Sequence, residues 1–209
     1  MKHYLVYKKL LDFLFSLILL ITVFPFMILA GIAIKIEDLR GPILFMQKRC
    51  GKDEKIFLVY KFRTMKVDVE RNGKPLSDME RMTKVGSFLR KTSIDELPQL
   101  FNILRGEMSF IGPRPLLVQY LEYYTSEQLR RHEVTPGISG WAQVNGRNTI
   151  SWNERFKYDV WYVDNVNPLL DIQILWLTLY NVLNRKDINN SQGDTMPVFT
   201  GNEQKDQMK

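Results

Sequence analysis

The sequence predicts an α+β protein in which an apolar N-terminal helix precedes a compact, mostly helical domain with a small β-hairpin. Three observations carry this prediction. An uncharged run of 22 residues starts at Phe13, two β-rich runs flank a charged turn at 51–54, and apolar residues recur at helical spacing beyond residue 79. We divide the chain into a membrane helix over 1–36, a folded domain over 37–186 and a polar tail over 187–209.

The uncharged run from Phe13 to Ile34 is long enough to enter a lipid bilayer, because about 20 apolar residues cross one as a helix. A secretory signal has a shorter apolar core of about 7 to 15 residues, which disfavours that alternative. Lysine and arginine residues flank both ends of the run. A spanning helix usually has most of its basic residues on one side.

Pro25 lies near the middle of this run and predicts a bend. A proline inside a helix removes one backbone hydrogen bond and clashes with the carbonyl four residues earlier, here that of Ile21. A re-entrant helix, which enters the bilayer, bends and leaves on the same side, explains both the proline and the basic flanks. A kinked helix that spans the bilayer is the alternative.

Basic residues are concentrated in the same half of the chain as the apolar run. Residues 1–91 hold 18 of the 29 Lys and Arg and 9 of the 23 Asp and Glu, a net charge of +9, whereas the remainder carries −3. This placement suits a surface that lies on anionic lipid headgroups, where each cation contributes about 1 kcal/mol. An ordinary solvated basic surface is the alternative.

Few residues are available for metal or nucleophilic chemistry outside the carboxylates and cations. Cys50 is the only cysteine, so an internal disulfide is excluded and a reducing compartment fits. With two histidines in the chain, a histidine-rich zinc site and a Ser-His-Asp site are both poor candidates.

Short elements are expected along the rest of the chain. Runs 42–45 and 56–60 predict a β-hairpin, and the polar segment 67–79 predicts a loop. Helices are expected over 79–89, 95–105 with Gly106 as the C-terminal cap, and 116–132.

Residues 161–185 form a second apolar concentration. Asp171, Gln173 and Asn181 interrupt it, so it does not predict a second membrane span. It suits an amphipathic helix at the membrane interface, and packing against the protein core is the alternative.

Asp95 and Glu96 are adjacent carboxylates at the start of a predicted helix. Ser93 and Glu96 have the spacing of a capping box, in which the glutamate side chain bonds the backbone at the helix start. Pro98 would also suit the first position of a helix that begins slightly later. The positive end of the helix dipole keeps carboxylates ionised and attracts phosphate. Capping alone would account for the pair, so a functional interpretation depends on its neighbours.

Cations in glycine-rich and proline-rich segments accompany the carboxylate pair. Mg²⁺ takes one or two carboxylates together with substrate phosphate oxygens, and arginine binds phosphate through paired hydrogen bonds. Consecutive helical residues point about 100° apart, which suggests that one carboxylate attacks phosphorus and the other holds the metal. The candidate phosphate-binding cations are Lys61, Arg63, Arg90, Arg114 and Arg147.

Four segments carry a family resemblance. They are Lys61-Phe62-Arg63-Thr64-Met65, Asp95-Glu96-Leu97-Pro98-Gln99-Leu100-Phe101-Asn102, Gly112-Pro113-Arg114-Pro115, and the run from Pro136 to Asn148. In this order they resemble the bacterial sugar transferase family, the monotopic polyprenyl-phosphate phosphoglycosyl transferases. The closest likeness is to undecaprenyl-phosphate N,N'-diacetylbacillosamine 1-phosphate transferases, supported by Leu116-Leu117-Val118, Ile150-Ser151-Trp152 and Phe199-Thr200-Gly201-Asn202.

The resemblance implies a re-entrant helix, a position on the cytoplasmic face of the bacterial inner membrane, and Mg²⁺ as cofactor. The implied reaction moves a sugar 1-phosphate from a UDP-sugar to undecaprenyl phosphate and releases UMP, as the first membrane step of glycoconjugate assembly. Downstream glycosyltransferases would be partners. UDP-N,N'-diacetylbacillosamine is the first candidate donor, followed by other N-acetylated amino sugars, glucose and galactose.

The resemblance also assigns residues. Asp95 is expected to be the covalent nucleophile and Glu96 the Mg²⁺ ligand, with Arg114, Lys61 and Asp159 as further active-site residues. Charge and position add Arg90 and Arg147 as expected substrate-binding residues, and Arg63 of the Lys61-Phe62-Arg63 segment is a third.

One departure concerns the membrane helix. The family commonly has serine before the kink proline, whereas here Phe24 precedes Pro25. Thr22 is the nearby polar side chain that could satisfy a freed backbone group.

Two other functions are open from sequence. Direct displacement, with both acids binding Mg²⁺, would give the same overall reaction. A non-enzymatic membrane scaffold or nucleic-acid binder would use the basic charge, but the aromatic residues cluster far from the basic half and no nucleic-acid module is recognised, so no nucleic-acid partner is expected.

Overall fold

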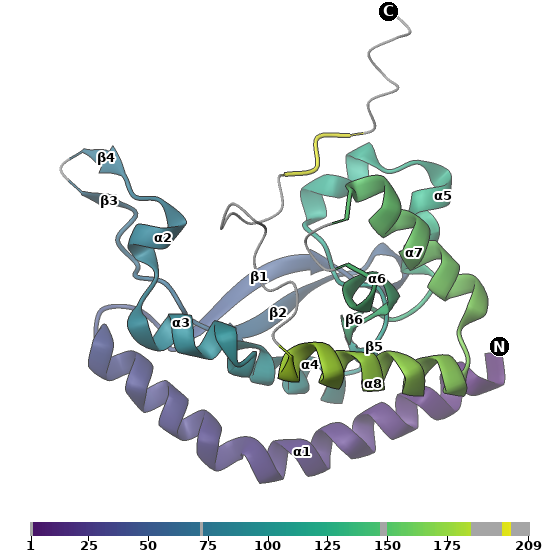
Figure 1. Ribbon diagram of the computed structural model, residues 1–209, viewed down its shortest axis with the longest axis horizontal. Coiled ribbons are helices and arrows are strands. Elements are labelled where there is room, and N and C mark those ends of the chain that lie inside the picture. Colours follow the sequence, from purple (N-terminus) through teal and green to yellow (C-terminus); the bar gives the residue numbers. More distant parts are fainter. Residues whose placement is uncertain (1, 72, 147–149, 185–197, 202–209) are drawn as a thin grey trace, which may run out of the picture.

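The structure, a computed structural model, describes residues 2–71, 73–146, 150–184 and 198–201, and it confirms the α+β class (Figure 1). A helix of 36 residues, α1 (Lys2–Glu37), lies beneath a domain whose described residues form short helices and three two-stranded sheets. It is long and apolar enough to cross a membrane by length and composition. The helix continues through Pro25, and Figure 1 shows it bent in its middle part with both ends rising toward the rest of the chain.

The domain contacts α1 along most of its length. Tyr4 and Leu5 pack against the cluster of Val163, Leu170 and Ile174 near the N-terminal end. At the other end, Met27, Ala30 and Ile34 pack against Phe62 and Leu89. Glu37 then accepts hydrogen bonds from the backbone of Lys84 and Val85 at 2.7 and 2.8 Å. Both ends of α1 therefore lie on the same side as the domain.

Polar residues at spacings of four hold the first half of α1 to the domain. Lys8, Asp12 and Ser16 are buried on this face. Lys8 forms an ion pair with Asp171, which also accepts hydrogen bonds from Tyr4 at 2.6 Å and Tyr162 at 2.7 Å. The polar groups of this network thus bond to one another within the interface, as burial requires.

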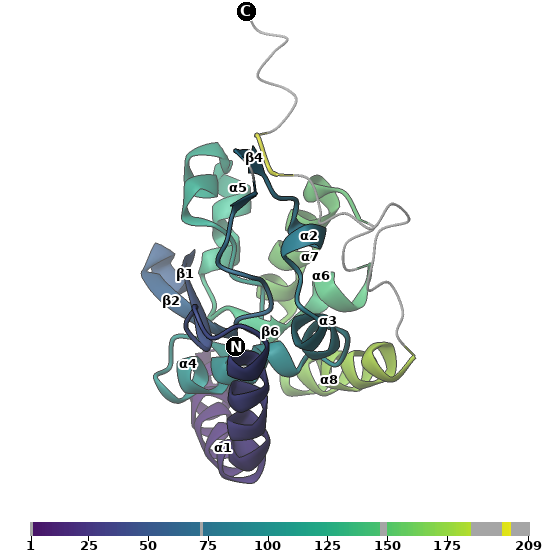
Figure 2. The same ribbon diagram turned by 90° about the vertical axis from the view of Figure 1, so that its left-hand side faces the viewer.

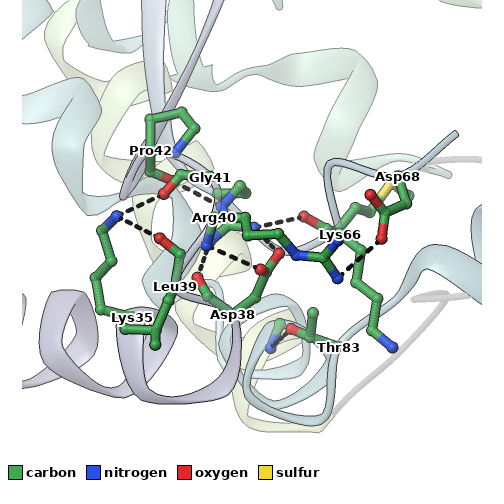
Figure 3. Close-up of polar contacts among 12 residues, drawn as sticks. Lys35, Asp38, Leu39, Arg40, Gly41, Pro42, Lys66, Asp68 and Thr83 are labelled. Carbon is green, nitrogen blue, oxygen red and sulfur yellow. Dashed lines mark hydrogen bonds and ion pairs between the residues drawn. The ribbon is translucent and has the colours of Figure 1, made fainter.

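The junction after α1 is fastened by polar contacts (Figure 3). Lys35 donates to the carbonyls of Leu39 and Gly41 at 3.0 and 2.8 Å, and the Arg40 backbone donates to Asp38. The Arg40 side chain reaches Asp68 at 3.2 Å. These contacts direct the chain from α1 into the first strand.

The predicted hairpin is confirmed. Strands β1 (Leu44–Cys50) and β2 (Ile56–Phe62) pair antiparallel, with Leu44 opposite Phe62, around the 3₁₀ turn η1 (Lys52–Glu54). Positive φ values at Asp53 and Glu54 give the tight turn. β2 faces the core through Phe57, Val59 and Phe62.

Two expectations for residues 67–89 were wrong. The expected loop contains a small antiparallel ladder of β3 (Glu70–Arg71) and β4 (Lys74–Pro75). The expected helix over 79–89 is two helices, α2 (Asp78–Arg81) and α3 (Lys84–Lys91). The break occurs because Thr83 caps α3 in an extended conformation, and its backbone N–H donates to Thr64 at 3.1 Å instead of continuing a helix.

The expected helix over 95–105 begins as a 3₁₀ helix, η2 (Ile94–Gln99), and continues as α4 (Leu100–Leu104). Gly106 follows with φ +72°, in agreement with its expected role at the helix end. Residues 116–132 are helical in three short pieces: η3 (Val118–Tyr123), α5 (Ser126–Leu129) and η4 (Arg130–His132). Strands β5 (Ser109–Ile111) and β6 (Gly137–Ser139) pair in parallel, followed by α6 (Trp141–Val144).

The second apolar concentration spans the end of α7 (Trp152–Asn165) and all of α8 (Pro168–Leu183). Leu170 and Ile174 of α8 are buried against the core, so the packing alternative holds for one face. The other face is exposed. Its apolar residues are Leu169, Ile172, Trp176, Leu179 and Leu183.

Part of the expected polar tail packs on the domain. Phe199 is buried among Tyr120, Trp152 and Phe156, with ring centroids 5.1 to 5.6 Å apart. The remainder, 187–197 and 202–209, lies outside the described residues.

Candidate active site

The 3₁₀ helix η2 presents the two adjacent carboxylates. Ser93 precedes it in the left-handed region at φ +57°, an uncommon conformation for a side chain other than glycine, and makes no side-chain capping bond. Of the two helix starts that the sequence allows, the capping box between Ser93 and Glu96 does not form, because the Glu96 side chain bonds Lys61 and Arg114 instead. Strain of this kind often accompanies functional segments.

Glu96 is held between two cations. Its Oε1 accepts from Lys61 Nζ at 2.5 Å and from Arg114 Nη2 at 2.7 Å. Burial opposes ionisation, but Arg114 and Lys61 outweigh it and lower the pKa of Glu96 far below its usual value. The carboxylate is thus ionised and fixed in position.

Asp95 has a different environment. Burial and the adjacent charge of Glu96 raise its pKa, against the opposing effect of Lys61, Arg90 and Arg114. It is 8% exposed, and within the described part of the chain its carboxylate has no hydrogen-bond or ion-pair partner. Lys61 and Arg114 therefore hold the Glu96 carboxylate in place, whereas no described side chain bonds the Asp95 carboxylate.

The apolar neighbours of the carboxylates pack η2 against α1. Ile94 and Leu97 pack with Phe101 against the cluster that contains Met27 and Ala30 of α1. The position of Asp95 and Glu96 is consequently tied to the second half of α1.

Arg114 is supported from behind by a buried ion pair. Arg131 donates to the Arg114 carbonyl at 2.7 Å and to Asp159 Oδ2 at 2.7 and 3.1 Å. The side chains of Arg131 and Asp159 are only 1% and 2% exposed. Asp159 therefore reaches the site through Arg131 and the backbone of Arg114.

The remaining expected residues fall into three groups. Arg90 lies close enough to Asp95 to influence its pKa, and it donates to Thr64 Oγ1 at 3.0 Å. Arg63 instead bonds Asp38 at 2.5 Å and the Pro42 carbonyl at 2.6 Å, so its contacts fasten β2 to the end of α1. Arg147 lies outside the described residues.

Sequence reasoning missed three arginines near this site: Arg49, Arg131 and Arg155. Arg155 precedes Asp159 by one helical turn, and this spacing was the available signal. Arg131 and Arg49 gave none, because their neighbours come from segments distant in sequence.

The carboxylate pair fits a magnesium ion that is shared with a substrate. No cluster of three or more His, Cys, Asp or Glu occurs among the described residues, so a site made of protein ligands alone is not present there. Both hydrogen bonds that the described side chains make to Glu96 go to Oε1, so Oε2 would be the atom to hold a metal ion. Mg²⁺ commonly binds in this way, through one or two carboxylates plus phosphate oxygens and water.

A carboxylate held by cations, a second carboxylate without such contacts and several further cations are typical of enzymes that act on phosphate groups. The family comparison agrees: the model of the bacterial sugar transferase family matches residues 3–185. The chain belongs to the bacterial sugar transferase family. Membership confirms the expected enzyme class and removes the alternative of a non-enzymatic scaffold.

Three relatives show the range of similarity. The chain is 48% identical over 197 residues to an uncharacterized sugar transferase, EpsL, of Bacillus subtilis, covering 94% of this chain and 97% of that one. It is 41% identical to a UDP-glucose:undecaprenyl-phosphate glucose-1-phosphate transferase of Klebsiella pneumoniae, covering 84% and 40%. A UDP-N-acetylgalactosamine-undecaprenyl-phosphate N-acetylgalactosaminephosphotransferase of Aeromonas hydrophila is 40% identical, with coverage of 84% and 43%. The chain thus spans about two fifths of the latter two proteins.

Proposed function

We propose that this protein transfers a sugar 1-phosphate from a UDP-sugar to polyprenyl phosphate, with undecaprenyl phosphate as the acceptor. The observation that carries the proposal is the contrast between two adjacent carboxylates. Lys61 and Arg114 bond Glu96 at 2.5 and 2.7 Å, whereas the Asp95 carboxylate has no such partner among the described residues. The names of the relatives from Klebsiella and Aeromonas support it, since both specify a UDP-sugar and undecaprenyl phosphate.

The proposed reaction has two displacements at phosphorus. An Asp95 carboxylate oxygen attacks the sugar-bearing phosphorus of the donor, and the bond to the bridging oxygen breaks, so that UMP leaves with the electron pair. An oxygen of polyprenyl phosphate then attacks the phosphosugar-aspartyl intermediate. The bond from phosphorus to Asp95 breaks and the free carboxylate is regenerated.

The protein groups divide this work by charge. Glu96 is the proposed Mg²⁺ ligand, and the metal, when bound, would offset negative charge on the diphosphate. Arg114 and Lys61 hold Glu96 in place and add positive charge near the transferred phosphate. Asp159, through Arg131, fixes the backbone of Arg114. Arg90 and Arg147 remain proposed substrate-binding residues.

We also propose that α1 is re-entrant, so that the protein is monotopic on the cytoplasmic face. The support is the contact of the domain with both Tyr4 and Glu37, because a spanning helix would carry one of its ends to the opposite side. Acceptor phosphate at headgroup level would then lie on the same side as Asp95.

A covalent intermediate distinguishes this mechanism from direct displacement. After mixing with a UDP-sugar and Mg²⁺ without acceptor, intact mass spectrometry is expected to show a phosphosugar adduct on the wild type and none on Asp95→Asn. Stoichiometric UMP release without acceptor should accompany the adduct. A fully active enzyme that shows no adduct, and releases UMP only with acceptor, would favour direct displacement.

The donor sugar is proposed to be an N-acetylated amino sugar, with UDP-N,N'-diacetylbacillosamine as the first candidate. The relatives named above specify glucose and N-acetylgalactosamine, which makes both essential comparisons. A panel of UDP-sugars assayed for UMP release in the presence of undecaprenyl phosphate tests this choice. Turnover of UDP-glucose in preference to every N-acetylated donor would overturn it.

A further inference from the structure

Residues 198–201 are the part of the chain beyond residue 184 that the structure describes, and the proposed reaction gives them no role. In Figures 1 and 2 this segment, drawn in yellow, lies on the side of the domain remote from α1. Phe199 is only 3% exposed, whereas its neighbour Val198 is 63% exposed. Gly201 has φ +112°, and a Cβ added there would lie 3.5 Å from a carbon of the Tyr123 ring. The segment is therefore docked on the domain through one inserted side chain.

Phe199 packs among five aromatic side chains from two parts of the domain. Its ring centre lies 5.1 Å from that of Phe156 and 5.4 Å from that of Trp152, both on α7. The other three rings belong to η3 and the residue that follows it: Tyr120, Tyr123 and Tyr124, at 5.6, 6.2 and 6.0 Å. Aromatic rings at these separations attract one another. Phe199 therefore joins α7 to η3, which begins four residues after Arg114.

Phe156 connects this aromatic cluster to the support of the phosphate site. The guanidinium carbon of Arg131 lies 5.9 Å from the centre of the Phe156 ring, within the range of a cation–π contact. Asp159, about one turn beyond Phe156 on α7, accepts two hydrogen bonds from the same guanidinium at 2.7 and 3.1 Å. Helix α7 thus holds Arg131 by a ring and by a carboxylate, and Arg131 in turn donates to the Arg114 carbonyl at 2.7 Å.

The position of Arg131 depends on how its neighbours pack. Its side chain is 1% exposed, and a buried ion pair is favourable only when its hydrogen bonds are well formed. Removal of the Phe199 ring would leave a cavity beside Phe156 into which the Phe156 ring could turn. Arg131 would then lose part of its packing, and its hydrogen bond to Arg114 would weaken.

We propose that Phe199 is a positioning residue for the phosphate site. It packs Phe156 against Arg131, and Arg131 holds the backbone of Arg114. The C-terminal segment 198–201 thus contributes to donor binding although it lies outside the group of residues that surround the substrate. The inference rests on the proposed function, which makes Arg114 part of the donor site.

Steady-state kinetics with a UDP-sugar and polyprenyl phosphate test this role. Phe199→Ala is expected to raise the donor KM about fivefold, the order of effect for weakening a hydrogen bond to a charged group. A loss of folded enzyme alone would instead lower the apparent kcat and leave KM unchanged. Val198→Ala is the matched control, since Val198 is adjacent and exposed. Phe199→Leu should fall between wild type and Phe199→Ala, and it replaces Phe199→Ala if that variant does not fold. A donor KM of Phe199→Ala within about twofold of the control value would overturn the proposal.

A double-mutant comparison tests the route through Arg131. In a protein that carries Arg131→Leu and Asp159→Leu, the group on which Phe156 acts is absent. Phe199→Ala should therefore cause no further rise in donor KM in that background, since effects that pass through one shared group are not additive. A further rise of about fivefold would show that Phe199 does not act through Arg131.

Hydrogen exchange measured by NMR tests the positioning role without catalysis. The Arg131 Nε–H bonds Asp159 at 3.1 Å, and the Gly112 backbone N–H, which bonds the Ser139 carbonyl at 2.8 Å, reports on overall unfolding. Exchange of the Arg131 Nε–H relative to that of Gly112 should be faster in Phe199→Ala than in Val198→Ala, and an equal ratio would overturn the proposal. A faster ratio in a protein whose wild type turns over no UDP-sugar would keep the contact between Phe199 and the Arg131 support and reject the transferase function.

Discussion

Asp95 and Glu96 are neighbours in sequence but have opposite electrostatic environments. Two cations surround Glu96 and lower its pKa, whereas burial and the Glu96 charge raise the pKa of Asp95. Groups whose surroundings separate their pKa values in this way often have different roles in one reaction. The environments, rather than the residue types, support the assignment of one acid to metal binding and the other to attack.

The buried pair of Arg131 and Asp159 predicts that a double variant can regain stability without regaining donor affinity. Asp159→Leu should lower the free energy of unfolding by about 3 to 5 kcal/mol, because it leaves a buried guanidinium without its partner. The double variant Arg131→Leu with Asp159→Leu should recover most of that stability. It should still show a raised KM for the donor, since the Arg114 carbonyl has lost its hydrogen bond.

Thermal unfolding in detergent and UMP-release kinetics measure the two effects. A double variant as unstable as Asp159→Leu, or one with an unchanged donor KM, would contradict the role of Arg131 and Asp159 in positioning Arg114.

His132 predicts a pH dependence of stability. Burial and the charge of Arg131 lower its pKa from 6.5 to about 4, and its Nδ1 bonds the Gly51 carbonyl at 3.0 Å. Between pH 6.5 and 4 the unfolded chain therefore binds more protons at this residue than the folded chain. The free energy of unfolding should fall by about 3 kcal/mol as the pH falls through this window.

His132→Asn keeps a donor for Gly51 and removes the titrating ring. The difference in unfolding midpoint between wild type and this variant, followed from pH 7 to 4, isolates the histidine from the carboxylates. A difference in unfolding midpoint that stays constant from pH 7 to 4 would show that His132 does not cause the pH dependence.

At the scale of elements, α1 depends on the polar network around Asp171. Asp171→Leu removes the acceptor of Lys8, Tyr4 and Tyr162 and should cost about 3 to 5 kcal/mol of unfolding free energy. Lys8→Met should cost less than about half of this, because Asp171 keeps two hydroxyl donors. Thermal unfolding of the two variants in the same detergent makes the comparison, and equal destabilisation would show that the hydroxyl donors contribute little.

The sequence predicted correctly those elements that nearby residues determine. It did not predict the contacts that residues distant in sequence determine. The hairpin turn and the helix end at Gly106 depend on nearby residues, and both were predicted. The capping box at Ser93 failed because Glu96 is drawn to Lys61, 35 positions away. In the same way, Arg63 bonds Asp38, a partner that hydropathy and motif spacing do not reveal.

For the molecule as a whole, α1 and α8 run along the lower side in two perpendicular views (Figures 1 and 2). The outward residues of α1 include Leu10, Ile21 and Leu29, each at least half exposed. On α8, the exposed apolar residues recur at spacings of three and four. Core packing and an interfacial position, the two alternatives expected for α8, are thus compatible. One face of the helix packs on the core, and the other face is exposed.

This apolar face of α8 predicts a contribution to membrane binding. Leu169→Ser with Leu183→Ser should reduce partitioning to anionic vesicles several-fold, because both side chains are about four fifths exposed and contribute little to the core. Trp176 fluorescence should shift to shorter wavelength when vesicles are added. Vesicle co-sedimentation measures partitioning, with Met79→Ser on the exposed side of α2 as the control. Unchanged partitioning together with an unshifted spectrum would place α8 outside the interface.

The docking of both ends of α1 on one side of the domain has a mechanical consequence. A helix that enters and leaves through the same leaflet adds volume to that leaflet alone, and the opposite leaflet gains nothing. If α1 is re-entrant as proposed above, the protein would act as a wedge whose insertion is easiest where lipid packing in its own leaflet is loosened by curvature. Membrane shape, as well as membrane charge, would therefore influence where Asp95 meets its lipid substrate.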